Sequence, residues 1–452
     1  MHPALAEVDW AAEQAAAVDL LRSLLAVDTS NPPGAEAACA ELVAEHLRGS
    51  GLEPVLLAAA PGRPNVIARL RGQGREPPLM LSAHLDVVPA EAERWSHPPF
   101  AAEVADGWIW GRGAVDDKHM AAASLAVLRL LARSGRPLRR DVILTAVADE
   151  EDGAGLGSAW LVAEHPELVR AGYVLGEVGG FTLHVGGRAL YPVQVAEKGA
   201  CMLRARASGD AGHGSLPRRD DAVTRLAAFL RRLGATRLPV QQSAALTRFV
   251  ADLAATQPQP ARSLLPLVEN RWLSGTLLGL LERREPSLAR SLSALSRNTA
   301  TATMVSAGSR SNVIPGTAEA LLDGRIAVGS SEDELLTQLR RMAGPFVEVE
   351  LLLGERPPVE QPIDTDLFAT IADVVSEHHP GAVALPTIIP GFTDGRFWSQ
   401  LGAVCYGFTP VRLQPGDPAF SDLFHADDER IPVAGFQSGV RMLADVVFRF
   451  CV

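Results

Sequence analysis

The alternation of apolar and polar residues along the first part of the chain predicts helices and strands in turn. Between residues 11 and 27 apolar side chains recur every three or four positions, the spacing of one helix face, and a run of turn formers follows. A second helix is expected over 35–48. Strand-like apolar segments follow at 54–58, at 65–71 and from Leu79 onward. Helices and strands that alternate in this way predict an α/β fold.

The middle of the chain has a different pattern. Residues 241–296 are rich in leucine, arginine and alanine, and prolines divide them into short helical runs. Their leucines and Trp272 are expected to form a packing surface. A strand is expected over 318–326, and Ser331 begins a capping box that starts another helix. Further strands and helices are expected at 346–353, 364–378, 403–408 and 431–448.

Length and composition limit the domain number, the kinds of binding partner and the location that are expected for this protein. With 452 residues, two domains are expected, because one hydrophobic core rarely grows that large. The formal net charge of -11 argues against nucleic acid or an anionic membrane as the main partner. The N-terminal residues lack the basic start of a signal peptide, and no stretch reaches membrane-spanning length. A cytoplasmic protein is therefore expected.

Cysteine and lysine are both scarce. The four cysteines are scattered without a CxxC pair, so neither a disulfide framework nor a thiolate zinc site is indicated. The chain has 40 arginines but only two lysines, Lys118 and Lys198. A lysine is favoured over arginine where a compact ammonium fits and a guanidinium does not, although chance placement explains the two positions equally well.

Histidine and carboxylate side chains occur where strands end. His84 and Asp86 are two residues apart at the end of the strand that starts at Leu79, so their side chains point to the same face. An imidazole beside a carboxylate suits a metal such as Zn²⁺, but a structural His–Asp pair is an equal alternative. Asp116 and Asp117 precede an alanine-rich helix, where they could bridge metals or cap the helix.

Two further groups of acids follow strands. Asp149, Glu150, Glu151 and Asp152 come directly after the apolar run 141–148, at the edge where open α/β sheets place their ligands. A solvated turn is the alternative explanation for such a run. Glu177 follows a strand expected at 171–175, so a carboxylate again stands at a strand end.

Four motifs in this order resemble a known family. They are HLDVVP at 84–89, GRGAVDDKH at 111–119, DEE at 149–151 and the later strand-end acid Glu177. Together they resemble the co-catalytic dizinc metallopeptidases, which include aminoacylase, glutamate carboxypeptidase, carboxypeptidase S, succinyl-diaminopimelate desuccinylase and acetylornithine deacetylase. The resemblance is closest to the carboxypeptidase S-like branch, and it spans nearly the whole chain.

The resemblance implies a site with two Zn²⁺ ions, for which Co²⁺ or Mn²⁺ could substitute. It implies that Asp116 bridges the metals through a loop with a cis peptide bond to Asp117, and that Glu150 is the general base. It also implies that Asp86 does not bind metal itself but orients the ring of His84. The metal ligands that it implies are His84, Asp116, Glu151, Glu177 and His425, the last from the FHADDE segment at 424–429.

The same resemblance implies the domain organisation. A zinc-peptidase-like catalytic domain, a mixed sheet flanked by helices, is expected to comprise 1–192 and 355–452. An α+β lid and dimerisation domain is expected to be inserted at 193–354, with 241–296 as a helical elaboration. The resemblance implies a homodimer in which His213, from the GDAGHGSLP segment, reaches the partner's active site to stabilise the oxyanion. Without the resemblance, a loop histidine would be taken as solvated.

The resemblance also implies a substrate. Asn312 and Arg325 match positions that hold a free α-carboxylate, and Gly391 begins a Gly-x-Thr-Asp turn beside the substrate. A metal-activated water would attack an amide carbonyl while Glu150 takes its proton and passes it to the leaving amine. The expected activity is hydrolysis of N-acyl amino acids or of C-terminal peptide bonds. Desuccinylase or acetylornithine deacetylase activity is the alternative, and an inactive binding module on the same fold is a remote one.

Overall fold

The chain divides into two structural units, each held together by its own internal contacts. The computed structural model describes residues 1–452, apart from the side chains of Ser287 and Glu355. The first unit comprises Met1–Val195, Gln361–Pro386 and Thr393–Val452, and the second comprises Ala196–Glu360 and Thr387–Phe392. The second unit is thus inserted into the sequence of the first.

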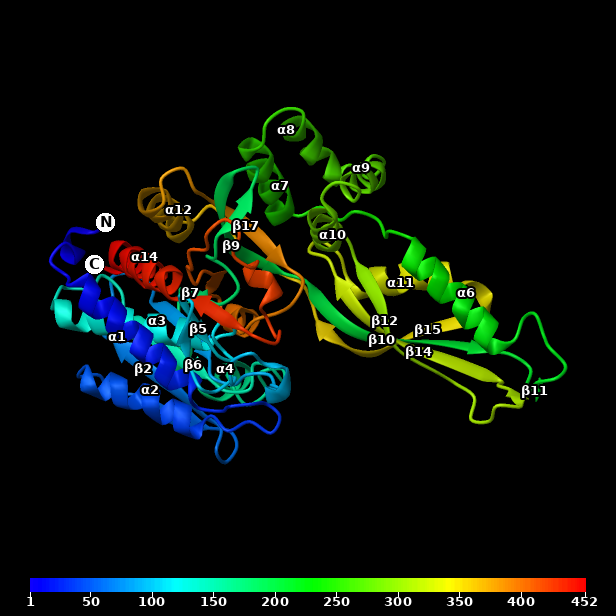
Figure 1. Ribbon diagram of the computed structural model, residues 1–452, viewed down its shortest axis with the longest axis horizontal. Helices are drawn as coiled ribbons and strands as arrows, with labels where there is room; N and C mark the ends of the chain where they lie inside the picture. Colours follow the sequence, from blue (N-terminus) through cyan, green and yellow to red (C-terminus); the bar gives the residue numbers. More distant parts are fainter. The chain divides into compact units, whose positions relative to one another are not determined.

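The first unit is built on a mixed β-sheet (Figure 1). Strand β3 lies between β6 and β7 and is parallel to both, while β2 and β1 extend the β6 side in antiparallel pairs. On the other side β18 is parallel to β7 and pairs antiparallel with β9, which β8 and β17 also join. The bounds are β1 Val55–Ala58, β2 Pro64–Leu70, β3 Leu79–His84, β6 Val142–Val147, β7 Tyr173–Gly176, β8 Leu183–Val185, β9 Arg188–Glu197, β17 Val383–Ile389 and β18 Val404–Gly407.

Helices cover both faces of this sheet. Helices α1, α3 and α14 contact one another, and α3 packs on β3 (Figure 1). On the opposite face Leu161, Val169 and Trp398, from α4, α5 and α13, pack with Met80 and Ile143 of the strands. Because both faces are covered, every residue of β3 and β6 is buried. The helices are α1 Trp10–Leu25, α2 Ala37–Gly49, α3 Lys118–Ser134, α4 Ser158–Glu164, α5 Pro166–Val169, α12 Asp366–His378, α13 Gly395–Trp398 and α14 Val433–Cys451.

Short elements complete the first unit. A three-stranded sheet in the order β19-β5-β4 brings the last part of the chain against Trp108 and Trp110, the ends of β5. The expected helices near 11–27 and 35–48 are confirmed as α1 and α2. No described helix is long and apolar enough to cross a membrane. The short elements are η1 Pro3–Leu5, η2 Ala92–Arg94, β4 Val104–Ala105, β5 Trp108–Trp110, η5 Ser399–Leu401, η6 Phe420–Asp422 and β19 Arg430–Pro432.

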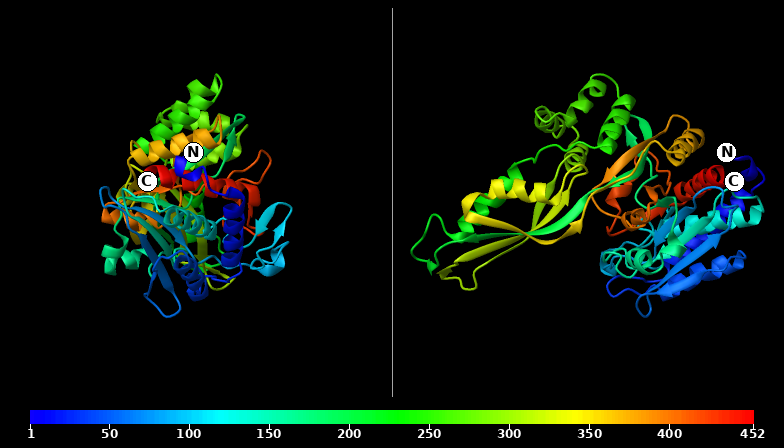
Figure 2. Two further views of the ribbon diagram at one scale, coloured as in Figure 1. Left: turned by 90° about the vertical axis from the view of Figure 1, so that its left-hand side faces the viewer. Right: turned by 180° about the vertical axis from the view of Figure 1, so that it is seen from behind.

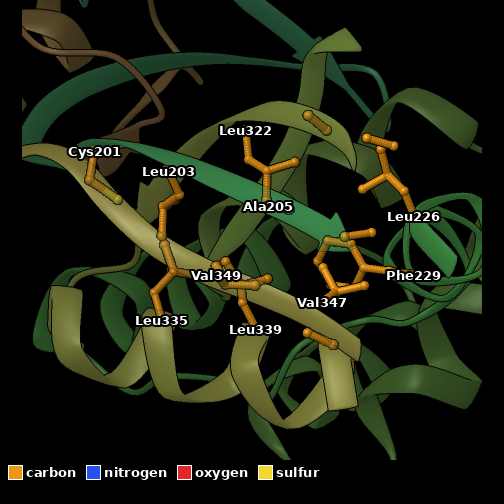
Figure 3. Packing of buried hydrophobic residues seen from close by; sticks show 14 of the residues in the cluster. Cys201, Leu203, Ala205, Leu226, Phe229, Leu322, Leu335, Leu339, Val347 and Val349 are labelled. Atoms are coloured by element: carbon orange, nitrogen blue, oxygen red, sulfur yellow. The ribbon is translucent and has the colours of Figure 1, made fainter. Parts of the chain in front are cut away.

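The second unit is built on a four-stranded antiparallel sheet in the order β12-β14-β10-β15. Burial alternates along β10 and β14, as expected when one sheet face is covered. Helices α6 and α11 lie side by side on that face (Figures 1 and 2) and contribute Leu226, Phe229, Leu335 and Leu339 to the core (Figure 3). The bounds are β10 Gly199–Ser208, β12 Thr299–Ala307, β14 Thr317–Ile326, β15 Val347–Arg356, α6 Ala222–Ala235 and α11 Glu332–Ala343.

The helical runs expected at 241–296 are confirmed and belong to the second unit. The buried side-chain nitrogen of Lys198 donates hydrogen bonds to the carbonyl of Ala294 (2.8 Å), in the last turn of α10, and to that of Arg297 (2.7 Å), just after the helix. It therefore satisfies carbonyls that a helix end leaves unpaired. The remaining elements of the second unit are β11 Gly212–His213, α7 Ala244–Thr256, α8 Ala261–Leu264, η3 Leu265–Glu269, α9 Ser274–Leu281, α10 Pro286–Leu295, β13 Val313–Ile314, η4 Gly344–Phe346 and β16 Val359–Glu360.

Candidate metal centre

The last residue of β3 faces two carboxylates. Nε2 of His84 lies 3.0 Å from Oδ1 of Asp116 and 3.6 Å from Oε2 of Glu177. Nδ1 of the same ring lies 2.9 Å from the main-chain oxygen of Asp86. Because a carbonyl oxygen only accepts, Nδ1 carries a hydrogen, and in the neutral ring the lone pair on Nε2 faces the two acids.

A second histidine faces the other side of Asp116. Nε2 of His425 lies 3.2 Å from Oδ2 of Asp116 and 3.1 Å from Oε2 of Glu151. Asp116 thus turns one carboxylate oxygen toward each imidazole, and it is the shared member of two groups that could each hold a metal ion. The peptide bond between Asp116 and Asp117 is cis, as the resemblance implies.

The donor atoms fit a pair of divalent cations. In each group the donor atoms lie within 4.8 Å of one another, close enough to bind one ion. Imidazole nitrogens with carboxylate oxygens suit Zn²⁺ and similar first-row metals. The Oε1 atom of Glu151 is buried and has no hydrogen-bond partner among the described atoms, which leaves it available as a ligand.

Without cations, two of the three acidic ligands hold protons more strongly than usual, whereas hydrogen bonds to His425 and His84 outweigh burial and lower the pKa of Asp116. Burial raises the pKa of Glu177 to about 8, and burial likewise raises the pKa of Glu151. Hydrogen bonds to Asp116 and Glu151 raise the pKa of His425 to about 10. Burial lowers the pKa of His84, but its contacts with Asp116, Asp86 and Glu177 outweigh burial, so the net shift is well upward.

Metal loading near neutral pH is therefore expected to release protons. His425 and Glu177 have pKa values of about 10 and about 8, so both are mainly protonated at neutral pH in the metal-free protein. A metal ligand must be deprotonated, so binding of both cations is expected to release about two protons per chain from these two ligands. Calorimetric titration of metal-stripped protein with ZnCl₂ in buffers of different ionisation enthalpy measures that number. A heat that does not change with the buffer would contradict this expectation.

Asp86 supports two parts of the site, the acidic turn at 149–151 and the ring of His84. Its carboxylate accepts hydrogen bonds from the main-chain N–H groups of Glu150 and Glu151, both at 3.1 Å, and from Nδ2 of Asn31 at 2.8 Å. The carboxylate lies 3.5 Å from Nδ1 of His84, farther than the main-chain oxygen of Asp86. Asp86 is thus placed to fix both His84 and the 149–151 turn.

Glu150 is buried between the strand ends. Burial is the main cause that raises its pKa well above the usual value, and the charge of Glu177 adds to the effect. Burial also raises the pKa of nearby Asp394 to about 6, and Asp394 accepts a hydrogen bond from Ser158. Bound cations would oppose this upward shift of the Glu150 pKa, because nearby positive charge favours the ionised carboxylate.

Sequence analysis missed the residue that supports the Asp116 loop. The buried carboxylate of Glu429 accepts hydrogen bonds from the main-chain N–H groups of Val115 (2.6 Å), Asp116 (3.1 Å) and Gly113 (3.1 Å). Arg112 also donates to it at 2.7 Å. Burial raises the pKa of Glu429 to about 7. The only available signal was its position in the FHADDE segment, where it is one of three acids.

Asn31 was also missed as a site residue. It lies within a run of turn formers, where an asparagine is common for local reasons. The structure places its side chain 2.8 Å from Asp86 and 3.2 Å from Oδ1 of Asp149. Arg63 donates to the same Asp149 oxygen at 3.1 Å, so the acidic turn is held from two sides.

The remaining predicted site residues belong to the second unit and form two groups. His213, on β11, is exposed and lies beside Asn312, whose main-chain oxygen accepts from the Gly214 N–H at 2.8 Å. Arg325, near the end of β14, donates to the carbonyl of Pro390, the residue before Gly391, at 3.4 Å. From Thr317 to Arg325 the strand spans roughly 26 Å, so Asn312 and Arg325 do not meet within one chain.

The chain is similar to known metallopeptidases. The family model described as "Peptidase family M20/M25/M40" matches residues 80–449. "N-fatty-acyl-amino acid synthase/hydrolase PM20D1" of Homo sapiens is 31% identical over 382 residues, which are 82% of this chain and 73% of that protein. "Aminoacylase-1" of Homo sapiens is 28% identical over 440 residues, 95% of this chain and 93% of that protein.

A solved structure supports the fold. The M20 family metallo-carboxypeptidase Sso-CP2 from Sulfolobus solfataricus matches with a TM-score of 0.66 and 18% identity, covering 95% of this chain and 98% of that one. At this identity the match establishes the fold alone. The family match and the relatives establish more: this chain belongs to peptidase family M20/M25/M40, a family of metal-dependent hydrolases.

Proposed function

We propose that this protein is a zinc-dependent amidohydrolase that releases an amino acid from an N-acyl amino acid or from the carboxyl end of a peptide. The observation that carries the proposal is the pair of ligand groups that share Asp116, with Glu150 held beside them by Asp86. The similarity to an N-fatty-acyl-amino acid hydrolase and to an aminoacylase supports the substrate class.

In this proposal His84, Asp116 and Glu177 hold one cation, and Asp116, Glu151 and His425 hold the other. When bound, two divalent cations supply positive charge that activates water and polarises the amide carbonyl. The same charge favours the ionised form of Glu150 over the protonated form that burial alone favours. Glu150 then takes a proton from the attacking water and returns it to the leaving amine.

The residues of the second unit are proposed to recognise the substrate. Arg325 and Asn312 would hold its free α-carboxylate, and the turn that begins at Gly391 would line the site. Arg325 already binds Asp323, with distances of 2.6 Å from Nε to Oδ1 and 2.9 Å from Nη2 to Oδ2. A substrate carboxylate must therefore share this guanidinium with Asp323 or displace Asp323. In either case Arg325 alone binds the carboxylate less strongly, so substrates that make additional contacts with the protein are favoured.

A homodimer agrees with the separation of Asn312 from Arg325 within one chain. In the proposed dimer, His213 and Asn312 come from the neighbouring chain, and His213 stabilises the oxyanion of the tetrahedral intermediate. A cytoplasmic location is proposed as well.

The activity is tested with a substrate panel. Metal-stripped protein, with and without added Zn²⁺, is incubated with N-acyl amino acids from acetyl to fatty acyl, with dipeptides and with succinyl-diaminopimelate and acetylornithine. Zinc-dependent release of an amino acid from substrates with a free α-carboxylate is the expected result, and esterified α-carboxylates are the matched control. Preferential cleavage of succinyl-diaminopimelate or acetylornithine would instead establish the alternative function. Two bound metals without hydrolysis of any member would overturn the substrate class, and failure to bind metal would support a binding module.

A further inference from the structure

Helix α9 (Ser274–Leu281) has apolar residues on two faces. Leu278 is fully buried against the neighbouring helices. Leu277, Leu280 and Leu281 follow the i, i+3, i+4 spacing and form a second apolar face. Leu280 is 57% exposed, so this second face is only partly covered by the chain itself. A helix with two apolar faces is expected to bury both of them.

The second face of α9 borders a cavity in the second unit. The cavity has a volume of about 480 Å³, and its lining residues come from the α8–η3 segment and from α9 with the two residues that follow Glu282. Helices α8 and α9 are labelled in Figure 1. Its apolar wall consists mainly of leucines, which range from buried Leu265 (8% exposed) to Leu280 (57% exposed) at the solvent side. Its volume falls within the range of small-molecule pockets, about 300–1,000 Å³. The leucines are Leu264, Leu265, Leu277, Leu280 and Leu281.

The charged residues that line the cavity are both cationic. They are Arg283 and Arg284, which follow the end of α9 and are exposed. Among the described side chains, no carboxylate lies within ion-pair distance of either guanidinium, and no acid lines the cavity. Glu282 and Glu285 flank the two arginines in sequence but do not line the cavity, and Glu282 pairs with Arg237 at 2.6 Å. The charge at the cavity itself is therefore positive and favours an anionic ligand.

We propose that this cavity binds a long-chain fatty carboxylate, with the acyl chain against the leucines and the carboxylate at Arg283 and Arg284. An apolar chain covers the exposed face of α9, and a carboxylate matches the paired donors of arginine. This binding site lies beyond the proposed function, because it includes neither the metal ligands nor Glu150. A fatty acid that binds here would occupy the helical elaboration, whose role the family resemblance leaves open.

Binding is tested with hexadecanoate, kept below its micelle concentration, by equilibrium dialysis against the full-length chain. One hexadecanoate per chain is expected, with hexanoate and hexadecyltrimethylammonium binding at least about tenfold more weakly, because one lacks the chain and the other has the opposite charge. Binding is expected to be the same for zinc-loaded protein, metal-stripped protein and the Glu150→Ala variant. These comparisons separate the cavity from the proposed active site, so either proposal can fail alone.

Variants with matched controls locate the ligand. Leu280→Asp is expected to weaken hexadecanoate binding about tenfold or more, while Leu273→Asp, at an exposed leucine outside the cavity, is expected to have no effect. The double variant Arg283→Glu with Arg284→Glu is expected to weaken it similarly, and the exposed pair Arg231→Glu with Arg262→Glu is its control. Circular dichroism confirms that each variant is folded.

Three outcomes would overturn the proposal. The first is equal hexadecanoate binding by the cavity variants and their controls. The second is binding that disappears when the metals are stripped, which would place the fatty acid in the catalytic site. The third is adsorption to anionic phospholipid vesicles without binding of monomeric hexadecanoate, which would identify a membrane-binding surface.

Discussion

Replacement of Glu150 with alanine is expected to reduce amide hydrolysis by about 10²–10⁴-fold while metal content stays near normal. Glu150 belongs to neither ligand group, so its loss leaves all five donor side chains in place. The lost step is the transfer of a proton from water and then to the leaving amine. Because the effect is on the chemical step, kcat is expected to fall more than KM rises.

The test of Glu150 combines steady-state kinetics on the best substrate of the panel with metal analysis by atomic emission. Asp152→Ala is the matched control, because Asp152 belongs to the same acidic run but is exposed. Its activity is expected to stay within about twofold of the parent, as for most surface substitutions. Hydrolysis retained by Glu150→Ala would remove the general-base assignment, and loss of metal in that variant would reassign Glu150 as a structural support of the centre.

Local sequence patterns were sufficient to predict the elements that carry the site. The apolar runs that became β3, β6 and β7 each end at an acid or histidine, and parallel strands bring their carboxyl ends to one edge. The sequence pattern thus predicted that His84, Glu150 and Glu177 stand at or just after strand ends, and the parallel pairing of these strands in the structure brings those ends to one edge. His425 lies in an irregular loop, so only the family resemblance pointed to it.

The supports of the site could not be predicted, because they depend on contacts between distant segments. Glu429 and Asp116 are 313 residues apart in sequence, and Asn31 and Asp86 are 55 apart. No periodicity marks either Glu429 or Asn31, since an acid among acids and an asparagine among turn formers are ordinary. The same limit applies to the cavity beside α9, because its walls come from separate segments, the α8–η3 segment and α9.

The structure gives a physical reason for the positions of the two lysines. Lys118 is buried and donates to the carbonyls of Leu24 (3.1 Å) and Val27 (2.7 Å), near the end of α1. Lys198 does the same at the end of α10. Each ammonium serves carbonyls that converge on one point, a geometry that suits a compact donor better than a planar guanidinium. Lys118 thus connects the GRGAVDDKH motif to the end of α1, and Lys198 connects the start of the second unit to the end of α10.

Replacement of Asp116 is expected to have the largest effect on metal content, because Asp116 is the shared member of the two ligand groups. Asp116→Ala is expected to lose both metals and all measurable hydrolysis. His84→Ala and His425→Ala each remove a donor from one group only, so each is expected to retain about one tightly bound metal per chain. Loss of a direct ligand is expected to lower metal affinity by more than the roughly 10–100-fold that follows removal of a side chain that only supports a ligand.

The comparison of these three variants distinguishes a shared centre from two independent sites. Metal per chain is measured after dialysis against a weak chelator, with His46→Ala, at an exposed histidine of α2, as the control. If Asp116 binds only one cation, Asp116→Ala will retain the other, and its metal content will equal that of one histidine variant. A shared carboxylate instead predicts that the metal content of Asp116→Ala falls below that of both histidine variants.

Thermal stability provides an independent measure, because a metal that binds only the folded state raises the free energy of unfolding. The stabilisation by added Zn²⁺ is therefore expected to be smallest in Asp116→Ala and intermediate in the histidine variants.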